Sequence, residues 1–207
     1  MLLKVVHYYK ELIWQNRSWF LAVSAVFVLG SLAGVAVSLA NPHLSEEMLK
    51  SYARSVSVGI KDGWPATVYI FQRNLAITSL ASLVGLFFGI APLFVAFING
   101  ALLGIVLNYP KIYSIASPFY IIALLVPHGI LEYFATFLAL AFGLRLGINW
   151  TLVTSAGRRR EIFFKNFREL LAIICLVVIL LFIAAFIEGF LTKRIADCLF
   201  GSCQLKL

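Results

Sequence analysis

Residues 118–150 read PFYIIALLVPHGILEYFATFLALAFGLRLGINW, and this stretch decides the class of fold. It is longer than the ~20 apolar residues with which a helix crosses the hydrocarbon core of a bilayer. Similar apolar runs cover residues 19–40, 75–109 and 170–192. None of them alternates polar and apolar residues as the strands of a membrane barrel do. The runs are therefore predicted to be membrane-spanning helices.

The composition supports the same class of protein. Of the 207 residues, 62% are hydrophobic and only 13% are charged, and the mean hydropathy is +0.96. A soluble domain is closer to half apolar and a quarter charged. We expect an all-α fold: a polytopic helical membrane protein with about five transmembrane helices, forming a single membrane domain over residues 1–207.

Prolines are expected to interrupt two of the apolar runs, because proline removes a helical hydrogen bond and clashes with the preceding turn. Near Pro92, the preceding Gly89 favours a break that gives helices of about 68–90 and 92–108. In the opening stretch a proline-glycine break is expected at residues 127–129. Two arrangements are open there: one kinked crossing, or a short half-helix followed by a full span.

The segments that flank the apolar runs are amphipathic or basic. Residues 1–17 repeat apolar side chains at helical spacing and are predicted to form a helix on the cytoplasmic surface. Residues 42–65 are predicted to be an amphipathic linker on the outer side, and residues 157–168 a basic cytoplasmic loop. Because basic loops tend to stay cytoplasmic, we expect a multi-pass protein of the cell membrane with its N-terminus in the cytoplasm and its C-terminus outside.

The formal net charge of +8 is better explained by a membrane surface than by nucleic acid. One basic cluster comprises Arg158, Arg159, Arg160, Lys165 and Arg168. It has no interleaved aromatic platform on which bases stack, so no nucleic-acid partner is expected. The expected partner is the lipid bilayer with its anionic headgroups. Cys198 and Cys203 would lie outside, where they form a disulfide only if the compartment is oxidising.

A few polar side chains in or beside the apolar runs are the candidate functional residues: Asn74, Asn99, His128, Glu132 and Glu188. His128 and Glu132 lie one helical turn apart on one face. The favoured interpretation is structural: each group is paired with another or with backbone freed by the proline, and the asparagines fix helix register. A site for an ion or a proton is one alternative. A metal site at His128 and Glu132 is another, although a structural zinc site usually needs four ligands.

Two motifs of small residues predict close contacts between helices. They are Gly85-x-x-x-Gly89 and Gly100-x-x-x-Gly104. Glycine is common in membrane helices, so the motifs predict packing faces and not a particular dimer.

Catalytic motifs are not found in the sequence. It has no nucleophile elbow, phosphate loop or metalloprotease signature. A hydrolase built on His128 and Glu132 lacks a nucleophile at a defined spacing. The protein is therefore predicted not to be an enzyme and to need no cofactor.

The most specific element of the sequence is Pro127-His128-Gly129-Ile130-x-Glu132. It accompanies Asn74, Gly85-x-x-x-Gly89, Asn99-Gly100-x-x-x-Gly104, Gly143 and Glu188. With these residues the chain resembles the stage II sporulation protein M family of bacterial and archaeal membrane proteins, over about residues 71–191. The resemblance implies an integral membrane protein of about five helices without known catalytic activity. In spore formers, the family's namesake acts during engulfment in a membrane complex with cell-wall-degrading partners.

Two functions are expected from these observations. The first is a non-catalytic integral membrane scaffold or anchor that assembles partner proteins or copies of itself. The small-residue faces and the lack of catalytic motifs favour it. The alternative is a membrane transporter or channel component with an intramembrane site of His, Glu and Asn, because interrupted helices and midplane polar residues are typical of transporters. Solute flux that depends on His128 or Glu132 would separate the two.

Overall fold

The computed structural model describes residues 2–56, 62–108, 118–152 and 156–199, and every regular element within these ranges is helical. In chain order the elements are α1 (Leu2–Gln15), α2 (Arg17–Ala40), α3 (Pro42–Val56), α4 (Trp64–Val84), α5 (Ile90–Asn108), α7 (Pro118–Leu152), α8 (Ala156–Ile187), the π-helical turn η1 (Glu188–Thr192) and α9 (Lys193–Leu199). The predicted all-α fold is confirmed. The suggested disulfide involves Cys203, which lies outside the described residues.

Within the described residues, four helical stretches are long and apolar enough to cross a membrane: α2, α5, α7 and the run through α8, η1 and α9. The chain is thus a polytopic helical membrane protein. The fifth predicted crossing corresponds to α4, which has 21 residues but is not among the four. Gln72, Arg73 and Asn74 reduce the hydropathy of α4, because polar and charged side chains are costly to place in hydrocarbon.

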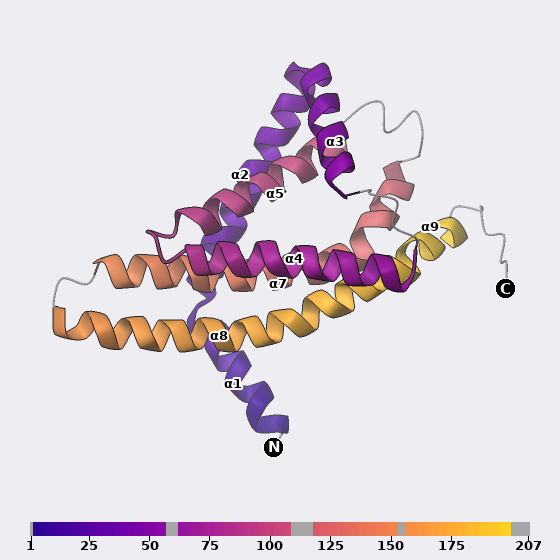
Figure 1. Ribbon diagram of the computed structural model, residues 1–207. Helices are drawn as coiled ribbons and strands as arrows, with labels where there is room; N and C mark the ends of the chain where they lie inside the picture. The colour runs from indigo at the N-terminus through magenta and orange to yellow at the C-terminus, as the bar shows by residue number, and fades with distance from the viewer. Residues whose placement is uncertain (1, 57–61, 109–117, 153–155, 200–207) are drawn as a thin grey trace.

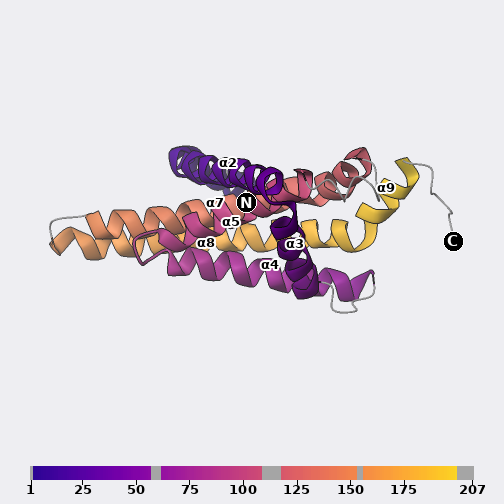
Figure 2. The same cartoon turned by 90° about the horizontal axis from the view of Figure 1, so that it is seen from above.

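α4, α7 and α8 lie side by side in both ribbon views (Figures 1 and 2). An apolar core fills the contact between α7 and α8, and α1 adds one residue to it. The core comprises Leu12, Ala135, Leu138, Ala139, Phe142, Leu146, Leu170, Ile173, Val177 and Leu181. The Tyr9 hydroxyl of α1 also donates a hydrogen bond to the Ala172 carbonyl oxygen, 3.0 Å away. The predicted N-terminal surface helix therefore forms, and it packs directly on the bundle.

α2 and α5 form a parallel pair in which backbone meets backbone. A Cβ added at Gly30 would overlap the Phe97 carbonyl group, and a Cβ at Gly104 would overlap the Ser31 carbonyl group. The motif Gly100-x-x-x-Gly104 thus provides the close contact that it predicts. Its partner face on α2 is Gly30-x-x-x-Gly34, which was not among the predicted packing motifs.

The break between α4 and α5 covers residues 85–89. Phe88 and Gly89 have positive φ angles of 60° and 70°. Glycine adopts this left-handed conformation without a steric penalty, so it ends the turn. Pro92 falls in the first turn of α5, where its missing N–H has no helical partner to lose. α4 therefore ends before the turn, several residues earlier than the predicted helix of about 68–90.

α7 is one continuous helix of 35 residues with Pro127 inside it. Figure 1 shows its first part turned away from the long remainder that lies beside α8. Proline is a usual cause of such a kink, because it removes one hydrogen bond of the helix. The structure therefore corresponds to a single kinked crossing and not to a separate half-helix.

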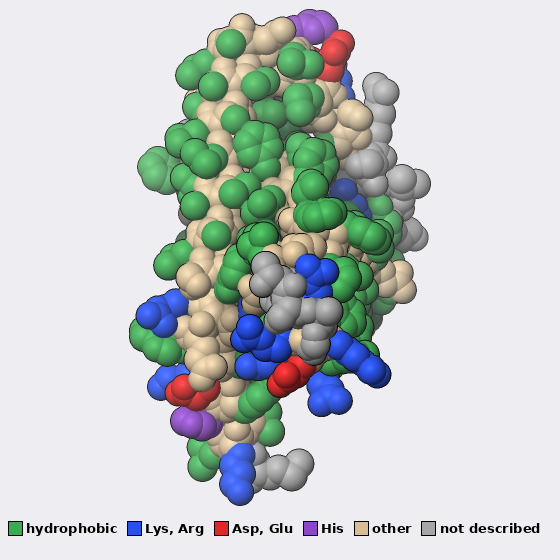
Figure 3. Space-filling model, turned by 90° about the vertical axis from the view of Figure 1, so that its left-hand side faces the viewer, with side chains coloured by type: hydrophobic (Ala, Val, Ile, Leu, Met, Phe, Trp, Pro, Cys, Tyr) green, Lys and Arg blue, Asp and Glu red, His purple; other side chains and the backbone are tan. Residues whose placement is uncertain are grey.

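The basic segment 157–168 is helical, which corrects the predicted loop. It forms the first turns of α8, because its Arg, Lys and Glu residues have good helix propensity and continue directly into the apolar run. Arg158, Arg159 and Arg160 are exposed. Figure 3 shows Lys and Arg side chains gathered in the lower half of the face where α7 ends and α8 begins, whereas the upper half is mostly hydrophobic.

Candidate intramembrane polar site

Two elements bring ionisable side chains together: α7 carries His128 and Glu132, and η1 begins with Glu188. One ligand atom from each of the three side chains lies within 4.8 Å of the others. His128 Nε2 is 3.7 Å from a carboxylate oxygen of Glu188. Only 12% of the His128 side chain and 35% of the Glu188 side chain are exposed. The structure thus joins three of the five sequence-predicted residues in a largely buried cluster, which we call the His–Glu–Glu cluster.

Thr192 orients the imidazole of His128. The Nδ1 atom of His128 lies 3.2 Å from the Thr192 hydroxyl oxygen. That hydroxyl donates its hydrogen to the carbonyl oxygen of Ile187, also 3.2 Å away. Because a hydroxyl has only one hydrogen, its oxygen must accept from the Nδ1–H of the imidazole. In the neutral imidazole the lone pair of Nε2 then faces Glu188.

The π-helical turn η1 holds this arrangement in place. Hydrogen bonds in a π-helix span five residues, and such turns occur frequently at functional sites. The Gly189 carbonyl oxygen accepts a hydrogen bond from the backbone nitrogen of Gly63, 2.9 Å away. A Cβ at Gly189 would collide with the hydroxyl of Thr67. The start of α4 and the turn η1 therefore pack closely.

The His–Glu–Glu cluster lines the first of two adjoining clefts. This cleft has a volume of about 240 Å³. Its ionisable and polar lining consists of Tyr52, Tyr69, Arg73, Asn74, His128, Glu132, Tyr133 and Glu188. The three cluster residues therefore border open space and do not close on one another in a dry, packed interior.

The second cleft has a volume of about 290 Å³ and extends along α5 to Asn99. The two clefts share Tyr52, Arg73, Asn74, Glu132 and Tyr133. Thr78 and Thr136 add hydroxyl groups that lie 3.4 Å apart. All five sequence-predicted residues thus line one cleft or both.

The two asparagines, which were predicted to fix helix register, both line the clefts. The amide nitrogen of Asn99 donates to the Val95 carbonyl oxygen of its own helix, 2.9 Å away. Asn74 lines both clefts, on the face of α4 that turns toward α7. Both residues therefore contribute polar surface to the clefts.

Three residues that contribute to the site were not among the five predicted candidates: Arg73, Tyr52 and Thr192. The Arg73 guanidinium lies 5.2 Å from the centre of the Tyr52 ring, within the range of a cation–π interaction. Two of the three could have been found from their proximity in sequence to a predicted candidate. Arg73 directly precedes Asn74, and Thr192 follows Glu188 by four positions. Tyr52 had no such signal, because it belongs to the amphipathic α3 and only the folded chain brings it to the cleft.

Over residues 23–193 the chain matches the family model described as stage II sporulation protein M. The chain belongs to this family. The resemblance carried by Pro127-His128-Gly129-Ile130-x-Glu132 is thereby confirmed. The polar residues that carried the resemblance are among the residues that line the two clefts.

Two relatives come from the archaeon Methanocaldococcus jannaschii. The chain is 27% identical over 199 residues to "Uncharacterized protein MJ0706". The matched region covers 90% of this chain and 87% of the relative. The chain is also 27% identical over 131 residues to "Uncharacterized protein MJ0793", and this match covers 63% of this chain and 72% of that protein. No solved structure was found to match the chain.

Proposed function

We propose that this protein binds a small cation or polar solute inside the membrane, as a transporter or channel component. One observation carries the proposal: the five polar residues expected from the sequence line two adjoining clefts that share a common wall. Ionisable side chains are costly within a membrane and are usually associated with ion or substrate pathways. A purely structural cluster would instead be packed, with each group satisfied by its neighbours.

The backbone around the clefts supports the same proposal. Transporter sites are commonly built where membrane helices are interrupted, because irregular backbone exposes polar groups to a bound solute. Here the kink of α7 at Pro127 and the π-helical turn η1 both adjoin the His–Glu–Glu cluster. The cluster therefore lies where two helices depart from regular geometry.

Liposomes that contain the purified protein test this proposal. Uptake of protons, monovalent cations and divalent cations is followed with fluorescent indicators trapped inside. We expect uptake of one of these ions by the wild type and at least a tenfold loss in His128→Ala and in Glu132→Gln. His7→Ala is the matched control, because His7 is exposed on α1, and it should behave as the wild type. Wild-type uptake no faster than in empty liposomes, with helical content intact, rejects the proposal.

A non-enzymatic membrane scaffold is the second candidate, and one observation favours it. The basic start of α8 presents Arg158, Arg159 and Arg160 to solvent. Such a surface suits anionic lipid headgroups and the acidic face of a partner protein. Stoichiometric copurification of one partner from native membranes, lost when the three arginines are replaced by glutamine, supports this function. Retention of the partner in that variant contradicts it.

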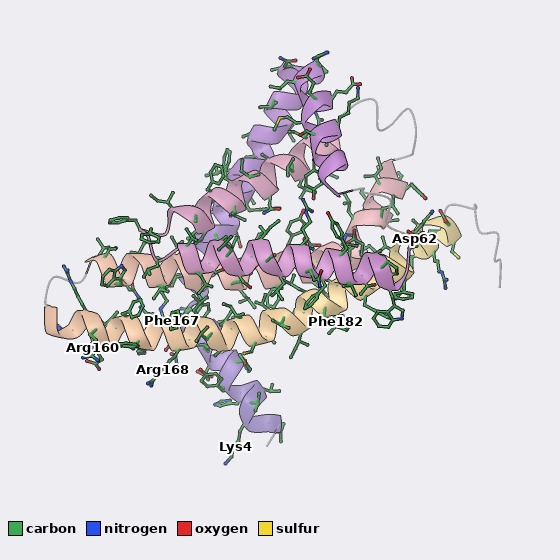
Figure 4. All side chains as sticks on the ribbon, viewed as in Figure 1. Lys4, Asp62, Arg160, Phe167, Arg168 and Phe182 are labelled. Atoms are coloured by element: carbon green, nitrogen blue, oxygen red, sulfur yellow. The ribbon has the colours of Figure 1, made fainter. Side chains whose placement is uncertain are left out.

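We further propose that the protein lies in the cell membrane with its N-terminus in the cytoplasm and its C-terminus outside. α1 packs on the same part of α8 that follows the basic segment, through Tyr9 and Ala172. Figure 4 shows Asp62 at the other end of the bundle from Arg160. The positive-inside tendency then assigns the Arg160 end to the cytoplasm.

A further inference from the structure

We propose that His128, Glu132 and Glu188 bind one divalent transition-metal ion, of which zinc is the representative example. This inference rests on the proposed function, because it concerns the same cleft. It specifies the class of ligand that binds there. Imidazole and carboxylate groups are the usual nitrogen and oxygen ligands of zinc. The three side chains offer one such atom each, all within 4.8 Å of one another.

The distances fit one shared ion after a small closure. Zinc bonds to nitrogen and oxygen are about 2.1 Å long, so two ligands of a tetrahedral ion are roughly 3.4 Å apart. His128 Nε2 and the Glu188 carboxylate are already 3.7 Å apart. Glu132 offers a carboxylate oxygen within 4.8 Å of the ligand atoms of the other two residues.

The orientation of His128 supports a metal more directly than the distances do. Thr192 fixes the proton on Nδ1, so the lone pair of Nε2 faces a carboxylate oxygen, which also has only lone pairs. Two acceptors that face each other repel unless a cation or a proton lies between them. A metal-bound histidine usually donates its other ring N–H to an oxygen atom, and the Thr192 hydroxyl oxygen takes that place here.

The charges in the cleft suit a divalent ion. Glu132 and Glu188 place two carboxyl groups within a small, largely buried volume that Arg73 also lines. A bound divalent ion would hold both carboxyl groups in the ionised form. Among the ion pairs formed by the described residues, none joins Arg73 to either carboxylate. Its guanidinium lies over the Tyr52 ring. The imidazole ligand favours zinc-like ions over Mg²⁺ and Ca²⁺, which prefer oxygen ligands alone.

The site would leave part of the ion's coordination to water or to a transported ligand. Three protein ligands fill three of the four positions of a tetrahedral ion, which is the pattern of zinc sites that keep an open position rather than of closed structural sites. The adjoining cleft of about 240 Å³ provides room for the remaining ligand.

Equilibrium dialysis with elemental analysis tests the site in the full-length protein, first stripped of metal with a chelator and then titrated with zinc. We expect one zinc ion per chain, and at least tenfold weaker binding in His128→Ala and Glu188→Gln. Thr192→Val should weaken binding about tenfold, because an outer-shell partner typically contributes that much. Co²⁺ in place of Zn²⁺ should give the visible absorption of a tetrahedral site. The exposed His7 and Glu11 supply controls, His7→Ala and Glu11→Gln, that should bind as the wild type.

Clear outcomes would overturn the inference. Less than one zinc ion per wild-type chain at saturation excludes the site, and so does unchanged affinity in Glu188→Gln. If His128→Ala does not fold, the nearly isosteric Glu132→Gln replaces it. Zinc binding without ion uptake in liposomes would reject the proposed transport and leave the site standing. Ion uptake without zinc binding would reject the site and leave transport standing.

Discussion

Arg145 is a residue whose role only its partners reveal. The sequence suggests a side chain near the cytoplasmic end that extends outward to water. In the structure it turns inward instead, where it forms an ion pair with Glu169 and donates to the Asn166 amide oxygen, 2.7 Å away. The side chains of the ion pair are only 11% and 18% exposed. α7 and α8 are therefore joined by a buried charged pair as well as by their apolar core.

Removing one partner of this pair should be strongly destabilising. We expect Arg145→Ala to lower the free energy of unfolding by roughly 3–5 kcal/mol, because Glu169 then stays buried without its counter-charge. The double variant Arg145→Ala/Glu169→Ala should lose less than the sum of the two single changes. Denaturant unfolding in detergent, followed by circular dichroism, measures this. Additive losses would show that the pair is not coupled.

At the scale of the element, glycine decides how closely two helices approach. α2 and α5 touch along Gly30, Gly34, Gly100 and Gly104, and each lies against backbone of the other helix. Gly129 of α7 differs, because the nearest atoms to an added Cβ are Tyr133 ring carbons at 3.8 and 3.9 Å. The same residue type thus has two roles, which the sequence alone does not distinguish.

Alanine substitutions should separate these two roles. We expect Gly100→Ala to lower the melting temperature, because its Cβ would overlap the Phe27 carbonyl group and force α2 and α5 apart. Gly129→Ala is the matched control and should be neutral or stabilising by up to about 1 kcal/mol, since alanine favours a helix interior. Thermal unfolding in detergent gives both values. A larger loss in Gly129→Ala than in Gly100→Ala would contradict the packing described here.

At the scale of the whole molecule, the bundle has two chemically different ends. One carries the exposed arginines at the start of α8, and the other carries Asp62 and η1 (Figure 4). The ion pair between Lys193 and Asp62 spans 3.9 Å with side chains 71% and 81% exposed, so it contributes little to stability. The exposed arginines at the start of α8 are the basis of the proposed orientation in the membrane.

Cysteine labelling tests the orientation. In a chain whose native cysteines are replaced by serine, Asp62→Cys should react with a membrane-impermeant maleimide in intact cells. Arg160→Cys should react only after the membrane is permeabilised, because the positive end remains in the cytoplasm. Both positions are exposed, so both should react in detergent and thereby control for accessibility. Labelling of Arg160→Cys in intact cells would reverse the proposed topology.

Much of this protein is determined by the sequence alone. Long apolar runs establish a helical membrane protein, since no other structure satisfies its backbone in hydrocarbon without a closed barrel. The same runs make every ionisable residue conspicuous, so the sequence alone predicts His128, Glu132 and Glu188 as candidate functional residues. Pro127 and Gly89 indicated the approximate positions at which helices bend or end, but not the exact residues.

Only the tertiary structure decided which of these features meet. It joined Glu188 to His128 across sixty positions of chain (128 to 188), brought Tyr52 over Arg73, and paired Arg145 with Glu169. It also showed the cluster bordering a cleft, where the sequence favoured closed pairing. The physical reason is that hydropathy and helical periodicity describe one segment at a time. Contacts between helices depend on crossing geometry, which the close fit of small residues and the kinks of the backbone set jointly.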